Sequence, residues 1–180
     1  MLVYAFIMEN PAANIRVLFV DRDYTEEGHL DERAIKMQRE IAHLMSEDFG
    51  LEKMFGLSER VALRIQERIR EGKKFGALVT HVPYNDVDDG YRRIGGSLYY
   101  LKRYAISLDI LSNIRRMNPQ LIIVAYTGAD IEVSECSRIF KENGVDAMVG
   151  KTLDPDRDYG YIKMHLDDFA AKRQENIGKI

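Results

Sequence analysis

Short apolar runs alternate along this chain with longer segments in which apolar residues recur every three or four positions. Runs of four to seven residues predict strands, and the periodic segments that follow each of them predict amphipathic helices. Continuous runs of Val, Leu, Ile and Phe are typical of strands buried on both faces, as in the middle of a parallel sheet. Five strands are predicted, at residues 17–20, 51–55, 75–81, 121–127 and 145–149.

Residues that cap or interrupt helices mark the predicted helix boundaries. The first helix carries apolar residues from Ala34 to Met45 and ends near Gly50. Residues 83–96 predict a polar loop before the third helix. The remaining boundary signals are Ser58 and Gly72 for the second helix, Ser97 and Asn118-Pro119 for the third, Asp130 and Gly144 for the fourth, and Asp154-Pro155 for the start of the last.

The regular alternation of strand and helix predicts an α/β fold with a doubly wound parallel sheet and helices on both faces. We expect a flavodoxin-like strand order, 2-1-3-4-5, in one domain that covers residues 15–180. Ligands of such sheets collect at the carboxyl ends of the strands. At that edge Asp21 and Asp23 should face Thr80 and His81, and Thr127 and Lys151 should end the next two strands, so these six residues form the candidate pocket.

Residues 1–14 form an extension ahead of this domain. Residues 1–8 are wholly apolar, and Asn10-Pro11 then signals a turn. An exposed apolar segment needs a packing partner. Two interpretations remain open at this point: an extra strand at the edge of the sheet, or a contact between two copies of the chain in a homodimer.

Composition narrows the class of protein. Charged residues make up 31% and hydrophobic residues 46%, an ordinary mixture for a globular domain. The net charge is −3 with no basic stripe, so we expect no nucleic-acid partner. The longest apolar run is too short to span a membrane, and a cytoplasmic location is the default expectation. Cys136 is the single cysteine, which excludes an internal disulfide and predicts a core or half-buried thiol.

Three motifs together resemble the receiver domains of bacterial response regulators. The match covers residues 15–175 and rests on the order and spacing of the motifs, which are Val17-Leu-Phe-Val-Asp-Arg-Asp23, Asn118-Pro-Gln-Leu-Ile-Ile-Val-Ala-Tyr-Thr-Gly-Ala-Asp130 and Gly144-Val-Asp-Ala-Met-Val-Gly-Lys-Thr-Leu-Asp-Pro155. In that family an aspartate at the end of the third strand accepts a phosphoryl group, and two acidic residues after the first strand hold Mg²⁺. A hydroxyl residue and a lysine bind the phosphoryl oxygens.

The chain departs from that pattern at the positions on which phosphorylation depends. Thr80 or His81 stands where the phosphoacceptor aspartate belongs, and Arg22 occupies the second acidic position. Arginine cannot coordinate Mg²⁺ and its charge repels the ion. Thr152 replaces the proline that follows the lysine. We therefore interpret the chain as a degenerate receiver, or pseudo-receiver, that keeps the fold and has lost phosphorylation on aspartate.

Each residue left in the pocket also has a plain structural interpretation. Lys151 beside Asp21 fits a structural ion pair, Thr127 a hydrogen bond at a strand end, and His81 a packed histidine. A weak Mg²⁺ site remains open if Asp23 turns inward to join Asp21.

Two alternatives involve other chemistry. The run Asp21-Arg-Asp-Tyr-Thr25 fits the Asp-x-Asp-x-Thr nucleophile motif of haloacid-dehalogenase-like phosphatases, which act with Mg²⁺, but the acidic strand end required after Lys151 is missing. Separately, an anion could bind at the predicted start of the third helix. That candidate site comprises Arg92, Arg93, Gly95, Gly96 and Ser97.

The interpretation that the sequence favours is a non-enzymatic, stand-alone receiver-like signalling module that acts through protein contacts. We expect no output domain after the last helix. The resemblance implies that the partner or dimer surface is formed by the fourth helix, the last strand and the last helix. Its exposed residues should lie within 132–143 and 157–172.

Overall fold

A computed structural model describes residues 15–21, 32–55, 59–70, 75–81, 91–94, 97–100, 108–127, 138 and 140–177. The predictions for residues 1–8 and for Cys136 lie outside these ranges.

Five parallel strands form the main sheet, in the order β2-β1-β3-β6-β7. This is the predicted 2-1-3-4-5 order, with β6 and β7 as the fourth and fifth strands. The strands are β1 (Arg16–Asp21), β2 (Gly50–Phe55), β3 (Ala77–His81), β6 (Ile122–Thr127) and β7 (Ala147–Gly150). Five of the six residues of β1 and all six of β6 are buried, as expected for strands covered on both faces.

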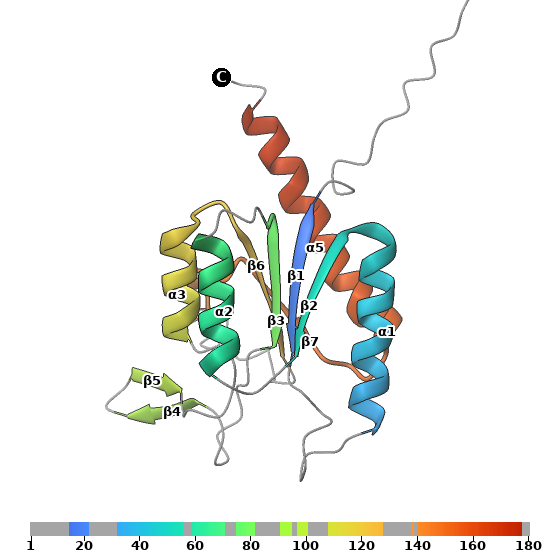
Figure 1. The fold of residues 1–180 in the computed structure, drawn as a ribbon, viewed down its shortest axis with the longest axis horizontal. Helices are drawn as coiled ribbons and strands as arrows, with labels where there is room; N and C mark the ends of the chain where they lie inside the picture. The colour runs from blue at the N-terminus through green and yellow to red at the C-terminus, as the bar shows by residue number, and fades with distance from the viewer. Residues whose placement is uncertain are drawn as a thin grey trace, which may run out of the picture.

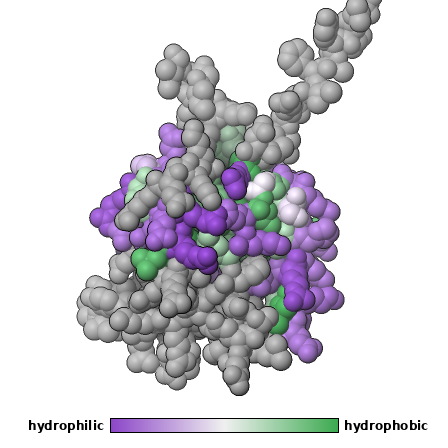
Figure 2. Space-filling model, in the orientation of Figure 1, coloured by the Kyte–Doolittle hydropathy of each residue, from purple (hydrophilic) through white to green (hydrophobic). Residues whose placement is uncertain are grey.

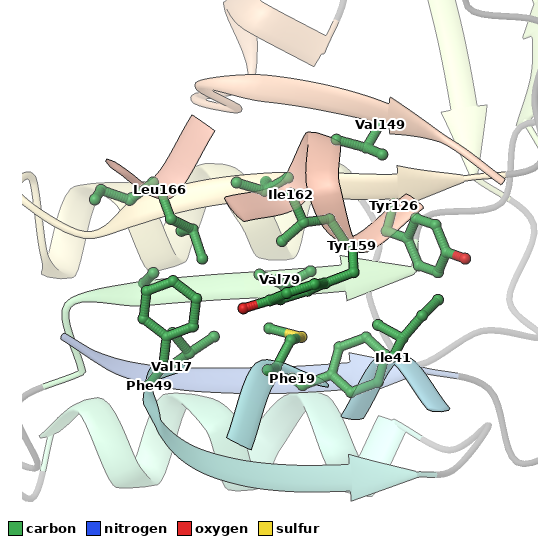
Figure 3. Close-up of a cluster of buried hydrophobic side chains, with 14 of the residues drawn as sticks. Val17, Phe19, Ile41, Phe49, Val79, Tyr126, Val149, Tyr159, Ile162 and Leu166 are labelled. Carbon is green, nitrogen blue, oxygen red and sulfur yellow. The ribbon is translucent and has the colours of Figure 1, made fainter. Parts of the chain in front are cut away.

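Helices cover both faces of the sheet (Figure 1). Alternate strand residues point to opposite faces, so each strand contributes to two separate cores. Val17 and Phe19 pack beneath α1 (Glu32–Asp48) and α5 (Pro155–Ile177), in the core that Figure 3 shows. Leu18 and Val20 belong to the other core, beneath α2 (Glu59–Arg70) and α3 (Leu108–Met117).

Several predicted helix boundaries are confirmed. The Asp154 side chain caps α5, since its Oδ1 accepts a hydrogen bond of 3.2 Å from the backbone N–H of Arg157. α3 ends at Met117, directly before Asn118-Pro119. Residues 140–142 are helical, and Gly144 ends that segment with a φ of 84°, a conformation that favours glycine.

The prediction for residues 83–100 was partly wrong. A polar loop was expected up to Gly96 and a helix from Ser97, but the structure has an antiparallel hairpin of β4 (Tyr91–Ile94) and β5 (Ser97–Tyr100). α3 begins only at Leu108. The hairpin is favoured by tyrosines in both strands and by the Gly-Gly pair between them, a typical two-residue hairpin connection. The helical spacing of leucines that continues into α3 hid these signals.

The described surface is largely polar. In the view of Figure 2 hydrophobic residues lie in small separate spots among hydrophilic ones. The large apolar side chains most exposed in the described residues are Leu63, Met117, Leu153, Tyr161 and Met164. Among the described residues no helix has the length and hydrophobicity needed to span a membrane.

Candidate functional site

The candidate site lies at the carboxyl ends of β1, β3, β6 and β7. Asp21 and His81 end their strands, and Lys151 directly follows β7. Asp21, His81 and Tyr126 follow the alternation that places Phe19, Val79 and Val124 in the core beneath α1 and α5. The three side chains therefore emerge on the same face of the sheet, where α5 begins.

Lys151 makes the central contact of the pocket. Its Nζ donates hydrogen bonds of 3.1 Å to both Oδ1 and Oδ2 of Asp21. The Asp21 side chain is 1% exposed and that of Lys151 16% exposed. A buried carboxylate requires such a partner because isolated burial of the charge is costly. The structure thus brings together two residues 130 positions apart, as the strand order predicted.

His81 completes this side of the pocket. Its Nδ1 lies 3.2 Å from the carbonyl oxygen of Tyr126 and 3.8 Å from Oδ1 of Asp21. A carbonyl oxygen can only accept a hydrogen bond, so this contact requires the tautomer with the proton on Nδ1, which donates a hydrogen bond to the Tyr126 carbonyl oxygen. The imidazole is therefore held by the neighbouring strand beside the Asp21 carboxylate.

The two threonines of the predicted pocket alternate onto the other face. Thr80 and Thr127 follow the residues that pack under α2 and α3, and both are fully buried. The hydroxyl of Thr80 donates to the carbonyl oxygen of His81 at 3.3 Å, and the carbonyl oxygen of Thr127 accepts the Lys151 N–H at 2.8 Å. The structure consequently brings together the side chains of Asp21, His81 and Lys151, whereas the two threonine side chains follow the opposite face of the sheet.

Three residues of the site were missed by the sequence analysis: Tyr126, Thr152 and Asp158. The Nζ of Lys151 lies 4.5 Å from the centre of the Tyr126 ring. The Tyr126 hydroxyl donates to Oδ2 of Asp158 at 2.7 Å, and the backbone N–H and hydroxyl of Thr152 also donate to this carboxylate. A signal was available, because Asp158 lies four residues before Ile162, at the inward spacing of an amphipathic helix.

The described residues do not fit a magnesium site. Within the described part of the chain, Asp21 provides the one carboxylate that contacts Lys151, and the Lys151 ammonium is bound to both of its oxygens. Asp158 is engaged by Thr152 and Tyr126 instead. Within the described ranges no three His, Cys, Asp or Glu side chains gather as a metal-ligand group. Asp23, the second predicted ligand, lies outside those ranges.

The region after Lys151 bears on the phosphatase alternative. That alternative requires a further strand with acidic residues at its end. Here α5 follows β7 directly, Asp154 caps this helix, and Asp158 is one of its buried residues. These acidic residues thus have structural contacts in the described chain.

The anion site was predicted at the start of a helix, and the structure has no helix start at Ser97. Arg92, Arg93 and Ser97 belong to the hairpin strands β4 and β5 rather than to a helix start. Gly95 and Gly96 lie outside the described residues. Anion binding by this segment stays a prediction from sequence.

A second Tyr–Asp–Lys group ties α1 to α5 away from the pocket. The Tyr159 hydroxyl donates to Oδ2 of Asp48, and the Nζ of Lys163 lies 3.0 Å from the same oxygen. The hydrogen bond from Tyr159 lowers the pKa of Asp48 below its usual value. Burial, followed by this bond to a carboxylate, raises the pKa of Tyr159 above its ordinary range. The group stabilises the contact between the end of α1 and the first turns of α5.

Comparison of the chain with models of protein families and with curated protein sequences found no match. Comparison with solved structures found many. The chain has the receiver fold.

Among the similar structures is a CheY-like response-regulator receiver domain protein from Methanospirillum hungatei, with a TM-score of 0.53 and 18% identity, covering 88% of this chain and 98% of the other. The signal receiver domain of an HD-domain-containing protein from Pseudomonas fluorescens has a TM-score of 0.53 and 12% identity, with 90% and 93% covered. An adenylate cyclase structure from Rhodopirellula baltica has a TM-score of 0.55 and 15% identity, with 93% and 99% covered.

Proposed function

We propose that this chain is a receiver-like signalling module that is not phosphorylated on aspartate and acts through protein contacts. The receiver fold supports a role in signalling. The observation that carries the finer proposal is the ion pair in the pocket: the Lys151 ammonium engages both carboxylate oxygens of Asp21. Lys151 then serves as the cation that neutralises Asp21.

The end of β3 supports the same proposal. Of the two residues that can stand at the phosphoacceptor position, His81 shares the face of Asp21, whereas Thr80 follows the opposite face. The Nδ1 of His81 is engaged with the Tyr126 carbonyl oxygen. A carboxylate nucleophile is thus replaced by an imidazole that packs against the next strand.

Incubation with acetyl phosphate and Mg²⁺, followed by intact-mass measurement, tests the absence of phosphorylation. We expect no added phosphoryl group on the full chain. Beryllofluoride with Mg²⁺ should likewise leave the backbone amide NMR signals of Thr127 and Lys151 unshifted. A covalent phosphate that maps to any aspartate contradicts the proposal. Asp21→Asn is the matched control, because any modification of Asp21 itself would disappear in this variant.

We further propose that the partner is a protein and that the surface used lies beside β7, with a second copy of the chain as one partner. The exposed Tyr161 and Met164 of α5 and the exposed side chains of Arg138 and Glu142 support this choice. Light scattering of the full chain, compared with a chain lacking residues 1–8 and with Tyr161→Ser/Met164→Ser, tests it. A monomer in all three cases contradicts the homodimer, and a dimer lost only without residues 1–8 assigns the contact to the extension.

A further inference from the structure

Asp158 is a buried acidic residue with a full set of partners. It is 0% exposed and lies in the first turns of α5. Its carboxylate accepts hydrogen bonds from the Thr152 N–H at 3.0 and 3.1 Å, from the Thr152 hydroxyl at 2.6 Å and from the Tyr126 hydroxyl at 2.7 Å. This one side chain thereby joins the end of β6, the turn after β7 and the start of α5.

Two of these residues, Thr152 and Tyr126, adjoin Lys151. Its backbone N–H is bonded to Thr127, the residue after it is bonded to Asp158, and its Nζ lies 4.5 Å from the centre of the Tyr126 ring. A lysine stem is flexible and has four rotatable bonds to lose. An ammonium over a tyrosine face gains favourable electrostatic energy from the ring, and the gain is larger when the ammonium is partly desolvated. The Tyr126 ring can hold the Lys151 ammonium at one position only if the ring itself is fixed.

We propose that Tyr126 and Asp158 are positioning residues, which hold the Lys151 ammonium on Asp21 and couple the pocket to the start of α5. Asp158 fixes the phenol hydroxyl, the fixed ring supports the ammonium, and the ammonium neutralises Asp21. We call Tyr126, Thr152 and Asp158 the tyrosine strut. A change in the charge of Asp21 releases Lys151 from the ring and alters the environment of Thr152.

This inference rests on the proposed function only in that it concerns the same pocket. Its readouts need neither a phosphoryl donor nor a metal ion. The two proposals can therefore fail separately.

The chain contains a matched control for the strut. Tyr159 also donates its hydroxyl to a carboxylate, that of Asp48, and it belongs to the same helix as Asp158. The lysine of that group, Lys163, lies over the ring of Phe49 rather than over Tyr159. Tyr159→Phe therefore removes the same kind of hydrogen bond without touching Lys151.

The first experiment follows the Lys151 side chain by NMR in the full chain labelled with ¹³C,¹⁵N-lysine, with Lys151→Arg used to assign the signal. Tyr126→Phe keeps the ring but frees it from Asp158. We expect the Lys151 ammonium to exchange with water about threefold faster or more, from the loss of part of the cation–ring contact. Asp158→Asn should act in the same direction, whereas Tyr159→Phe should leave the signal unchanged. An unchanged Lys151 signal in Tyr126→Phe, or an equal change in Tyr159→Phe, overturns the proposal.

The second experiment changes Asp21 and measures the effect at Thr152, so that Tyr126, Thr152 and Asp158 themselves are left unaltered. Asp21→Asn should shift the backbone amide signal of Thr152, which donates to Asp158, but not the amide signals of Asp48 and Phe49. A double-mutant cycle of Asp21→Asn with Tyr126→Phe should be non-additive in urea unfolding, and the cycle with Tyr159→Phe should be additive. An unshifted Thr152 amide overturns the proposal even if the strut variants do not fold.

Discussion

Two Tyr–Asp–Lys groups each include at least one residue of α5, and they differ mainly in their access to water. The buried cluster consists of Tyr126, Asp158 and Lys151, and the rim cluster of Tyr159, Asp48 and Lys163. Asp158 is 0% exposed, whereas the Asp48 side chain is 36% exposed. Figure 3 shows Tyr126 near the carboxyl ends of the strands and Tyr159 over the middle of the sheet.

We therefore expect the same three side-chain types to contribute differently to stability in the two clusters. At the rim, water can replace a lost hydrogen bond and salt screens the charges, so each contact contributes little. In the buried cluster Asp158 and Tyr126 are closed to solvent, so the loss of a partner leaves their polar groups with most of the desolvation cost. The comparison therefore predicts that a carboxylate's contribution to stability follows from its burial more than from its number of partners.

The largest effect should come from breaking the buried charge pair. Lys151→Met leaves Asp21 without its ammonium, and urea unfolding should show a loss of roughly 3 kcal/mol in the free energy of unfolding. Adding Asp21→Asn should recover most of that loss, because the uncompensated carboxylate is gone. Lys163→Met, the matched change at the rim, should cost less than about 1 kcal/mol. Equal losses for the two lysine variants would remove the distinction between the clusters.

A smaller effect should separate the two carboxylates. Asp158→Asn keeps the shape but weakens three hydrogen-bonding contacts, and thermal or urea unfolding should show a loss of about 2 kcal/mol. Asp48→Asn should cost about 0.5 to 1 kcal/mol, since its negative charge at the C-terminal end of α1 also opposes the helix dipole. A loss for Asp48→Asn as large as for Asp158→Asn would contradict the role given to burial.

The smallest effect concerns the pH dependence at the rim. The hydrogen bond from Tyr159 lowers the pKa of Asp48 below 3.8 in the folded state. A lowered folded pKa means that the stabilisation is present above the unfolded value and is lost as the pH falls through the folded value. The difference in unfolding free energy between the wild type and Asp48→Asn should therefore be constant from about pH 7 to 5 and shrink below about pH 4. The exposed neighbour change Glu47→Gln provides the control, and a difference that grows in acid would contradict the assignment.

Much of the fold could be predicted because the relevant signals are local. Buried strands such as 121–127 are continuous apolar runs, and Asp154-Pro155 marks a helix start in two residues. The hairpin of β4 and β5 was missed because leucine spacing can suit a helix while Gly95-Gly96 and the tyrosines favour paired strands. Local preference was ambiguous there, and the pairing of two strands decided the outcome.

By itself the sequence determined the strand order and the edge at which Asp21, His81 and Lys151 meet. Only the tertiary structure decided that Lys151 engages both oxygens of Asp21 and that Tyr126 and Asp158 lie behind it. The reason is that strand order follows from local periodicity and general rules of chain connection. Side-chain partners from β6, the turn after β7 and α5 meet only once the sheet and its helix have packed.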